Sequence, residues 1–63
     1  MDDDLPTAIG APARRALTAA GITRLPQLTT TTEAELLALH GVGPKAVAVL
    51  RQALAERGAA FRR

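Results

Sequence analysis

Residues 39–45 read LHGVGPK and predict a tight reversal between two helices. Gly41 can adopt a positive φ at no steric cost, so the chain can turn back on itself there. Val42 is expected to turn inward and anchor the turn to the core. Pro44 has the φ of a helix and lacks only an N–H that would have no partner at this position. The stretch therefore predicts a helix that ends at residue 39 or 40 and another that begins at Pro44.

The segments on either side of this turn have helical periodicity. The last helix is predicted from Pro44 to Gly58, a residue suited to a helix C-terminus. Its apolar stripe is expected to contain four residues, Val47, Leu50, Ala53 and Leu54. The helix before the turn is predicted to begin after Thr32, because Thr32 and Glu35 have the spacing of a capping box. Both helices therefore have a start signal of their own.

An earlier pair of helical segments is predicted in the N-terminal half. A helix should run from Pro12 to a cap at Gly21, with Arg14 and Arg15 on its polar face. Its apolar face is expected to consist of Ala13, Ala16, Leu17 and Ala20. Thr23 is expected to cap a short helical turn that follows. The stretches AIGAPARRAL (8–17) and LHGVGPKAVAVL (39–50) each place a glycine and a proline ahead of a basic helix, a weak internal repeat.

The composition favours one small all-α domain. A chain of 63 residues buries only about 60% of the surface that its unfolded form exposes. The chain has no cysteine, so no disulfide bond can stabilise it. Phe61 is its one aromatic residue and is expected at the edge of the core with Leu5 and Ile9. We expect residues 1–4 to be an acidic, disordered N-terminus. Residues 5–61 should form a compact four- to five-helix domain built from two related halves.

The positive charge is concentrated in the predicted folded part. Formal net charge is +2, but three of the six acids are Asp2, Asp3 and Asp4. From residue 5 onward there are eight Lys and Arg against three Glu, 8 − 3 = +5. Such an excess on a small domain attracts polyanions, although it also has a simpler explanation in solubility. The same two interpretations apply to five further arginines: Arg24, Arg51, Arg57, Arg62 and Arg63.

Several classes of function are disfavoured. No apolar run approaches the ~20 residues that a membrane-spanning helix needs, and the acidic start does not resemble a secretory signal. We expect a cytoplasmic protein. His40 stands alone, without the neighbours of a metal site, and is expected to be a solvated turn residue. No nucleophile and base are paired in the sequence, so we expect neither an enzyme nor a cofactor.

The turn itself predicts a site for a phosphate group. Gly43 leaves the backbone bare, so another surface can approach closely. The helix that starts at Pro44 offers free N–H groups and the positive end of its dipole, with Lys45 alongside. The alternative is that the glycines serve only the geometry of the turn. The basic excess of the domain favours the phosphate site.

Residues 36–50, LLALHGVGPKAVAVL, resemble the helix-hairpin-helix motif, whose hairpin reads apolar–x–Gly–apolar–Gly–x–basic. The resemblance implies binding of duplex DNA without sequence reading, with hairpin amides and a lysine holding phosphates across the minor groove. Residues 5–61, including GITRLPQLTTTTEAELLALHGVGPKAVAVLRQALAERGAAF (21–61), are also similar to the C-terminal domain of the bacterial RNA polymerase alpha subunit, a SAM-like fold.

The alpha-subunit resemblance implies DNA contacts at Gly43, Lys45, Ala46 and Arg15. Pro12 stands where that family inserts an arginine into the minor groove, so selective binding of A·T-rich DNA is not expected. Combining residues and resemblance, we predict a DNA-binding site of seven residues: Gly41, Val42, Gly43, Lys45 and Ala46, with Arg14 and Arg15 on the flank. The expected partner is the phosphate backbone of duplex DNA, which implies a nucleoid-associated protein.

A protein-interaction module is the alternative function. Such a module would belong to a transcription or repair complex and make no direct DNA contact. The face that could receive a partner helix is rich in small residues: Ala48, Val49 and Ala55.

Overall fold

The computed structural model describes residues 4–63 and is helical, as predicted. Its elements, in chain order, are η1 (Thr7–Ile9), α1 (Ala11–Ala19), η2 (Leu25–Thr30), α2 (Glu33–Leu37) and α3 (Pro44–Glu56), where η denotes a 3₁₀ helix. Within this range the only β-type pairing is an isolated bridge between Asp4 and Arg24. The disordered terminus predicted for residues 1–4 falls mostly on residues 1–3, which lie outside the described residues.

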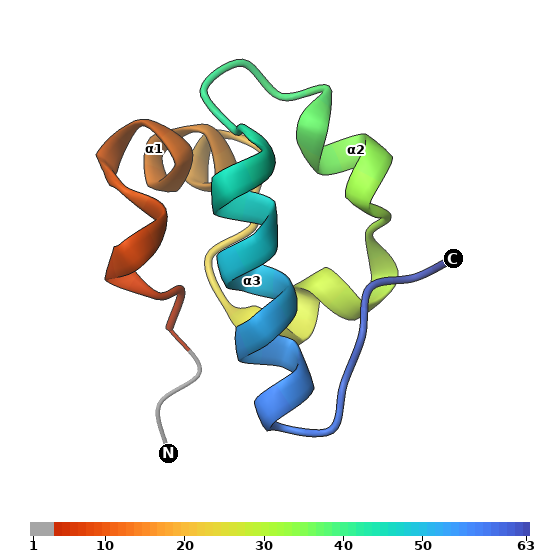
Figure 1. Ribbon diagram of the computed structural model, residues 1–63. Coiled ribbons are helices and arrows are strands. Elements are labelled where there is room, and N and C mark those ends of the chain that lie inside the picture. The colour runs from red at the N-terminus through yellow and green to blue at the C-terminus, as the bar shows by residue number, and fades with distance from the viewer. Residues whose placement is uncertain (1–3) are drawn as a thin grey trace.

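The longest helix, α3, runs through the middle of the molecule, with α1 and α2 on either side of its N-terminal half (Figure 1). Every element contributes to one core of buried residues: Leu5, Ile9, Ala13, Leu17, Leu25, Leu28, Leu36, Val42, Ala46, Val47, Leu50 and Leu54. Phe61 is half-buried and packs against this cluster, as expected from the sequence. Removal of these apolar side chains from water is the main force that holds the short helices together.

The buried face of α3 differs from the predicted stripe at two alanines. Ala46 is buried, with 6% of its surface exposed, and packs with Val47 and Leu50. Ala53, which was predicted to be in the core, is only half-buried. Its side chain lines an open groove between α3 and Pro6, where no other element covers the helix. The buried face of α3 therefore includes Ala46 in addition to Val47, Leu50 and Leu54, and excludes Ala53.

Helix α2 is shorter than predicted. It ends at Leu37, two or three residues before the expected position, because the N–H of Leu39 bonds to the carbonyl of Leu36 at 3.0 Å and tightens the chain into a turn. The connection to α3 therefore contains residues 38–43 rather than three or four residues. Leu37 stays 46% exposed, the one large apolar side chain so exposed among residues 4–63.

Helix α1 ends at the predicted glycine. Gly21 has φ = 84°, and the N–H of Ile22 donates to the carbonyl of Leu17 at 2.8 Å. With the bond from the Gly21 N–H to Thr18, this is a Schellman motif. Ala20 is exposed at the helix end instead of belonging to the apolar face, because the chain leaves the helix there.

The cap of η2 is Gln27, and the prediction of a Thr23 cap was wrong. The Oε1 atom of Gln27 accepts from the N–H of Thr23 at 2.8 Å and from that of Arg24 at 2.9 Å. Its Nε2 atom donates to the carbonyl of Gly21 at 2.8 Å. A longer amide side chain can accept and donate at once, so it joins the end of α1 to the start of η2.

The capping box at the start of α2 is confirmed. Glu35 N–H donates to Oγ1 of Thr32 at 3.1 Å, and Thr32 N–H donates to Oε1 of Glu35 at 2.8 Å. The C-terminal segment lies against this cap, because Arg62 donates its N–H to the carbonyl of Thr31 at 3.0 Å and forms an ion pair with Glu35 at 3.5 Å. The Arg62 guanidinium, whose Nε also donates to the carbonyl of Thr30 at 3.1 Å, therefore ties the C-terminal segment to this cap, while 57% of its side chain stays exposed.

A second ion pair joins α2 to α3. Nη2 of Arg51 lies 2.5 Å from Oε1 of Glu33, and its Nε lies 3.2 Å from Oε2. This hydrogen bond is the main cause of the lowered pKa of Glu33. At Glu35 the pKa is lowered chiefly by the backbone N–H of Thr32.

These two carboxyl groups predict a loss of stability in acid. A group whose folded pKa lies below its unfolded value stabilises the fold above the unfolded pKa, and this contribution disappears as pH falls through the folded pKa. We therefore expect the free energy of unfolding to fall between about pH 5 and pH 3. Urea titrations followed by circular dichroism at each pH should show a shallower fall for a Glu33→Gln/Glu35→Gln variant. An unchanged slope would assign the acid sensitivity to other groups.

Candidate nucleic-acid interface

The chain between α2 and α3 forms a loop at one end of the molecule (Figure 1). We refer to residues 41–46, which include the end of this loop and the first turn of α3, as the hairpin site. Five of the seven predicted DNA-binding residues belong to it. These five residues differ in burial: Val42 and Ala46 are buried, Gly43 is half-buried, and Gly41 and Lys45 are exposed.

Val42 anchors the hairpin to the core. Its side chain is buried in the core with 7% exposure, as predicted. Its N–H donates to the carbonyl of Leu39 at 3.2 Å, so its amide is also occupied. Val42 therefore has a structural role in the hairpin, and neither its side chain nor its N–H is free for the predicted contact with DNA.

Gly41 is required by the fold. It has φ = 98°, in the region that favours glycine, as the sequence predicted. In addition, a Cβ atom at this position would lie 3.1 Å from the carbonyl oxygen of Pro12 and 3.7 Å from Cβ of Ala16. The hairpin thus rests directly on the backbone of α1. The geometry of the turn is therefore sufficient to explain why residue 41 is a glycine.

Gly43 is required by neither conformation nor packing. Its φ of −111° and ψ of 177° are extended values that any residue adopts. A Cβ atom there would meet no other atom within 4 Å. Gly43 is the N-cap of α3, yet no side chain caps this helix. A serine or aspartate would suit the position better for stability, so the bare backbone calls for another explanation.

The first turn of α3 presents free donors beside a cation. The first bond of the helix runs from Val47 N–H to the carbonyl of Gly43 at 3.1 Å, which leaves the N–H groups of Lys45 and Ala46 without a helical acceptor. The methyl group of Ala46 is buried, so only its amide can reach a ligand. Lys45 is exposed, and among residues 4–63 no carboxylate lies within ion-pair distance of it.

Of the two predicted flanking arginines, Arg15 lies nearer than Arg14 to the side of α1 that touches the hairpin. Pro12 and Ala16 mark the side of α1 that touches Gly41. Counting about 100° per residue, Arg15 lies about 80° from this side and Arg14 about 180° from it. Nη2 of Arg14 instead donates to the carbonyl of Leu5 at 3.0 Å. Arg15 is exposed and can flank the hairpin site, whereas Arg14 holds the N-terminal segment on α1.

His40 is exposed beside the hairpin and lines a small apolar groove with Leu39, with Ala16 and Ala19 of α1, and with Ala20 at the C-cap of that helix. In the part of the chain that the structure describes, no group of three or more His, Cys, Asp or Glu side chains could hold a metal ion. None of the helices in residues 4–63 has the length and apolar character needed to cross a membrane.

Comparisons with family models, with curated proteins and with solved structures gave no match for this chain. Three features of this region were not predicted from the sequence: the contact between Gly41 and Pro12, the burial of Ala46 and the position of Arg14. Each depends on contacts between segments that are distant in the sequence, for which the local sequence carries no signal.

Proposed function

We propose that this domain binds duplex DNA through the phosphate backbone and does not read the base sequence. The observation that carries the proposal is Gly43, a bare N-cap with open space beside it and no role in the fold. It stands between a rigid turn, anchored by Val42, and the exposed ammonium group of Lys45. A phosphate is the common ligand that matches free amides, a helix dipole and a cation together.

The same proposal includes the helix-hairpin-helix resemblance and the two-halves architecture. Two features of the backbone support it. Gly10 precedes α1 as Gly43 precedes α3, and neither N-cap has a side-chain cap. In each helix a proline, Pro12 or Pro44, follows within the first two positions. The two N-termini also belong to adjacent segments, because Gly41 contacts the backbone of Pro12.

The contacts available at the hairpin site favour positioning over base recognition. Backbone amides and a lysine bind phosphate oxygens, which carry no sequence information. With Arg15 on the flank, we expect two to four phosphates to be neutralised, which corresponds to a log–log salt slope of roughly −2 to −4. A single small site of this kind should bind with a Kd of about 10⁻⁴ to 10⁻⁶ M. The proposed activity requires neither a cofactor nor a catalytic step.

Fluorescence anisotropy with a labelled duplex tests this function. Lys45→Ala is expected to weaken binding about fivefold at low salt and to reduce the magnitude of the salt slope by about one, because one phosphate contact is lost. Arg63→Ala is the matched control: it removes one exposed positive charge from the C-terminal tail, away from the hairpin (Figure 1).

Equal losses in the two variants would mean that only net charge matters, and the hairpin site would not be the interface. Binding that is absent in the wild type, or that does not respond to salt, would reject DNA as the ligand. Two duplexes of different sequence should bind with the same Kd, since no base contact is proposed.

A further inference from the structure

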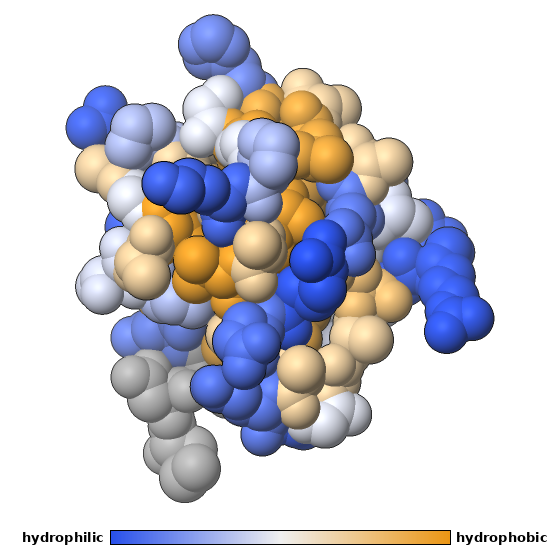
Figure 2. All heavy atoms as spheres, viewed as in Figure 1, coloured by the Kyte–Doolittle hydropathy of each residue, from blue (hydrophilic) through white to orange (hydrophobic). Residues whose placement is uncertain are grey.

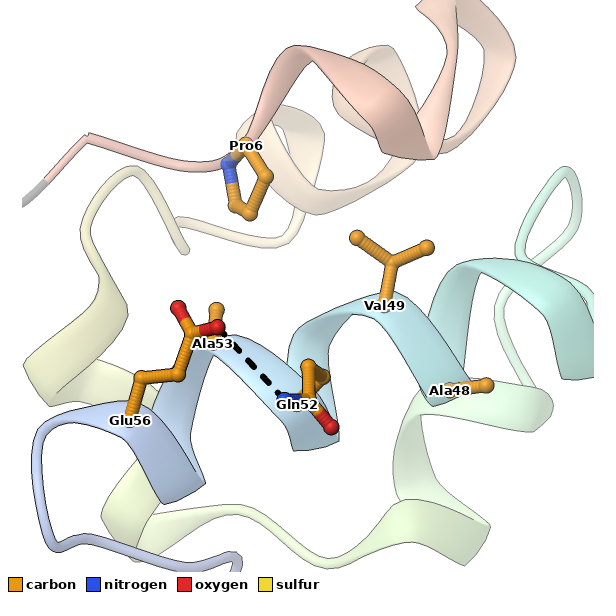
Figure 3. Close-up of a pocket in the computed structure, with 6 residues that line it drawn as sticks. All are labelled: Pro6, Ala48, Val49, Gln52, Ala53 and Glu56. Carbon is orange, nitrogen blue, oxygen red and sulfur yellow. Dashed lines mark hydrogen bonds between the residues drawn. The ribbon is translucent and has the colours of Figure 1, made fainter.

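A groove on another side of α3 lies outside the fully buried core and outside the hairpin site. Pro6 forms one wall, and five residues of α3 form the other: Ala48, Val49, Gln52, Ala53 and Glu56. The ring of Pro6 and the side chain of Val49 point into the space between them (Figure 3). Apolar side chains gather between η1 and α3 on the face that Figure 2 shows, with hydrophilic ones around them.

The helical wall of this groove belongs to a longer stripe with opposite charges at its two ends. Lys45 precedes Val49 by four residues and therefore lies on the same side of α3. We refer to Lys45 and the five groove residues of α3 as the outer stripe. Lys45 is its cationic end and Glu56 its anionic end, about 16 Å apart along the helix. Small or polar side chains lie between them.

Neither end of the stripe is neutralised within the described chain. The carboxylates of Glu33 and Glu35 pair with Arg51 and Arg62. Glu56, in contrast, has only a 3.5 Å hydrogen bond from Nε2 of Gln52, which is drawn in Figure 3. The stripe thus presents an uncompensated carboxylate at one end and an uncompensated ammonium group at the other.

We propose that the outer stripe docks a second copy of this chain, with the two α3 helices antiparallel across a two-fold axis. Such an axis brings Lys45 of each copy next to Glu56 of the other and forms two identical ion pairs. Between them, Ala48 of one copy faces Ala53 of the other, and these small side chains let the helices approach closely. The partner is a second copy rather than another protein, because the two oppositely charged ends of the stripe pair with each other across a two-fold axis.

The dimer is expected to be weak, because one helix face and Pro6 cover less than the roughly 1,200 Å² of a standard interface. Lys45 also belongs to the hairpin site. If the proposed DNA binding holds, duplex DNA and the second copy compete for the Lys45 ammonium group. This competition rests on the proposed function, whereas the dimer itself does not.

Sedimentation equilibrium over a range up to millimolar protein tests the dimer. The wild type should show a mass average that rises with concentration. Glu56→Lys should weaken association at least about tenfold, because both ion pairs become repulsive. The charge-exchanged variant Lys45→Glu/Glu56→Lys should regain association to within about threefold of wild type, since it restores both pairs. Circular dichroism confirms that each variant is folded.

A wild type that stays monomeric throughout would overturn the proposal. So would self-association that Glu56→Lys leaves unchanged, or a charge-exchanged variant that stays as weak as Glu56→Lys. Glu56 lies at the opposite end of α3 from the hairpin, so this variant keeps the hairpin site intact. DNA binding and dimer formation can therefore fail independently of each other.

Discussion

Gly41→Ala is expected to lower the free energy of unfolding by about 2–5 kcal/mol. Forcing an alanine to φ = 98° costs about 1–2 kcal/mol. The new methyl group would also lie 3.1 Å from the carbonyl oxygen of Pro12, and relief of such overpacking costs about 1–3 kcal/mol more. A core of this size rarely supplies more than about 3–5 kcal/mol, so much of the variant should be unfolded at 37 °C.

Gly21→Ala separates the two causes. Gly21 has a similar φ of 84°, but no atom lies within 4 Å of its Cβ position. It should therefore lose only the conformational part, about 1–2 kcal/mol. Urea unfolding followed by circular dichroism measures both variants. Equal losses would show that the contact with Pro12 does not constrain the hairpin.

Gly43→Asp is expected to act in opposite directions on stability and on DNA binding. An aspartate at this N-cap can accept the N–H of Ala46 and should raise the free energy of unfolding by about 0.5–1 kcal/mol. The same carboxylate takes the place proposed for a phosphate. Like charges about 4 Å apart near a protein surface repel by up to about 4 kcal/mol before salt screening. We expect the Kd for duplex DNA to rise at least about thirtyfold.

Gly43→Ser is the uncharged partner of this variant. Serine is an equally good cap, so its effect on stability should be similar. It should weaken DNA binding only several-fold, because it occupies an amide without adding charge. Thermal unfolding and anisotropy titrations on the same preparations compare the two properties. If Gly43→Asp bound DNA as well as the wild type, the open corner beside Gly43 would not be the phosphate site.

Features that depend on a few neighbouring residues were predicted correctly from the sequence. The capping box of Thr32 and Glu35, the positive φ of Gly41 and Gly21, and the inward position of Val42 are all confirmed. Each follows from a side chain that satisfies a nearby backbone group, or from a residue type suited to one backbone conformation. The all-α class follows from the same local signals.

Features that depend on which hydrogen-bond partner a group finds in the folded chain were missed. The length of α2 was overestimated, because Leu39 fits a helical pattern although its N–H has already changed acceptor. Arg14 was predicted as a surface contact, but a carbonyl nine residues earlier in the chain binds its guanidinium. The cap formed by Gln27 was not predicted. Nothing in the sequence distinguishes a glutamine that binds the N–H groups of preceding residues from any other polar residue. Such partners become visible only once the helices are placed.

The contact between Gly41 and the carbonyl of Pro12 limits how far the hairpin can be separated from its surroundings. A graft of residues 32–57 onto another scaffold would carry the N–H groups proposed to bind phosphate and the Lys45 side chain. It would lack the backbone of α1 at Pro12, on which the hairpin rests. Transplanting the proposed site therefore requires α1 as well. The smallest portable unit extends from Leu5 to Arg62, because Phe61 packs against the core and Arg62 pairs with Glu35.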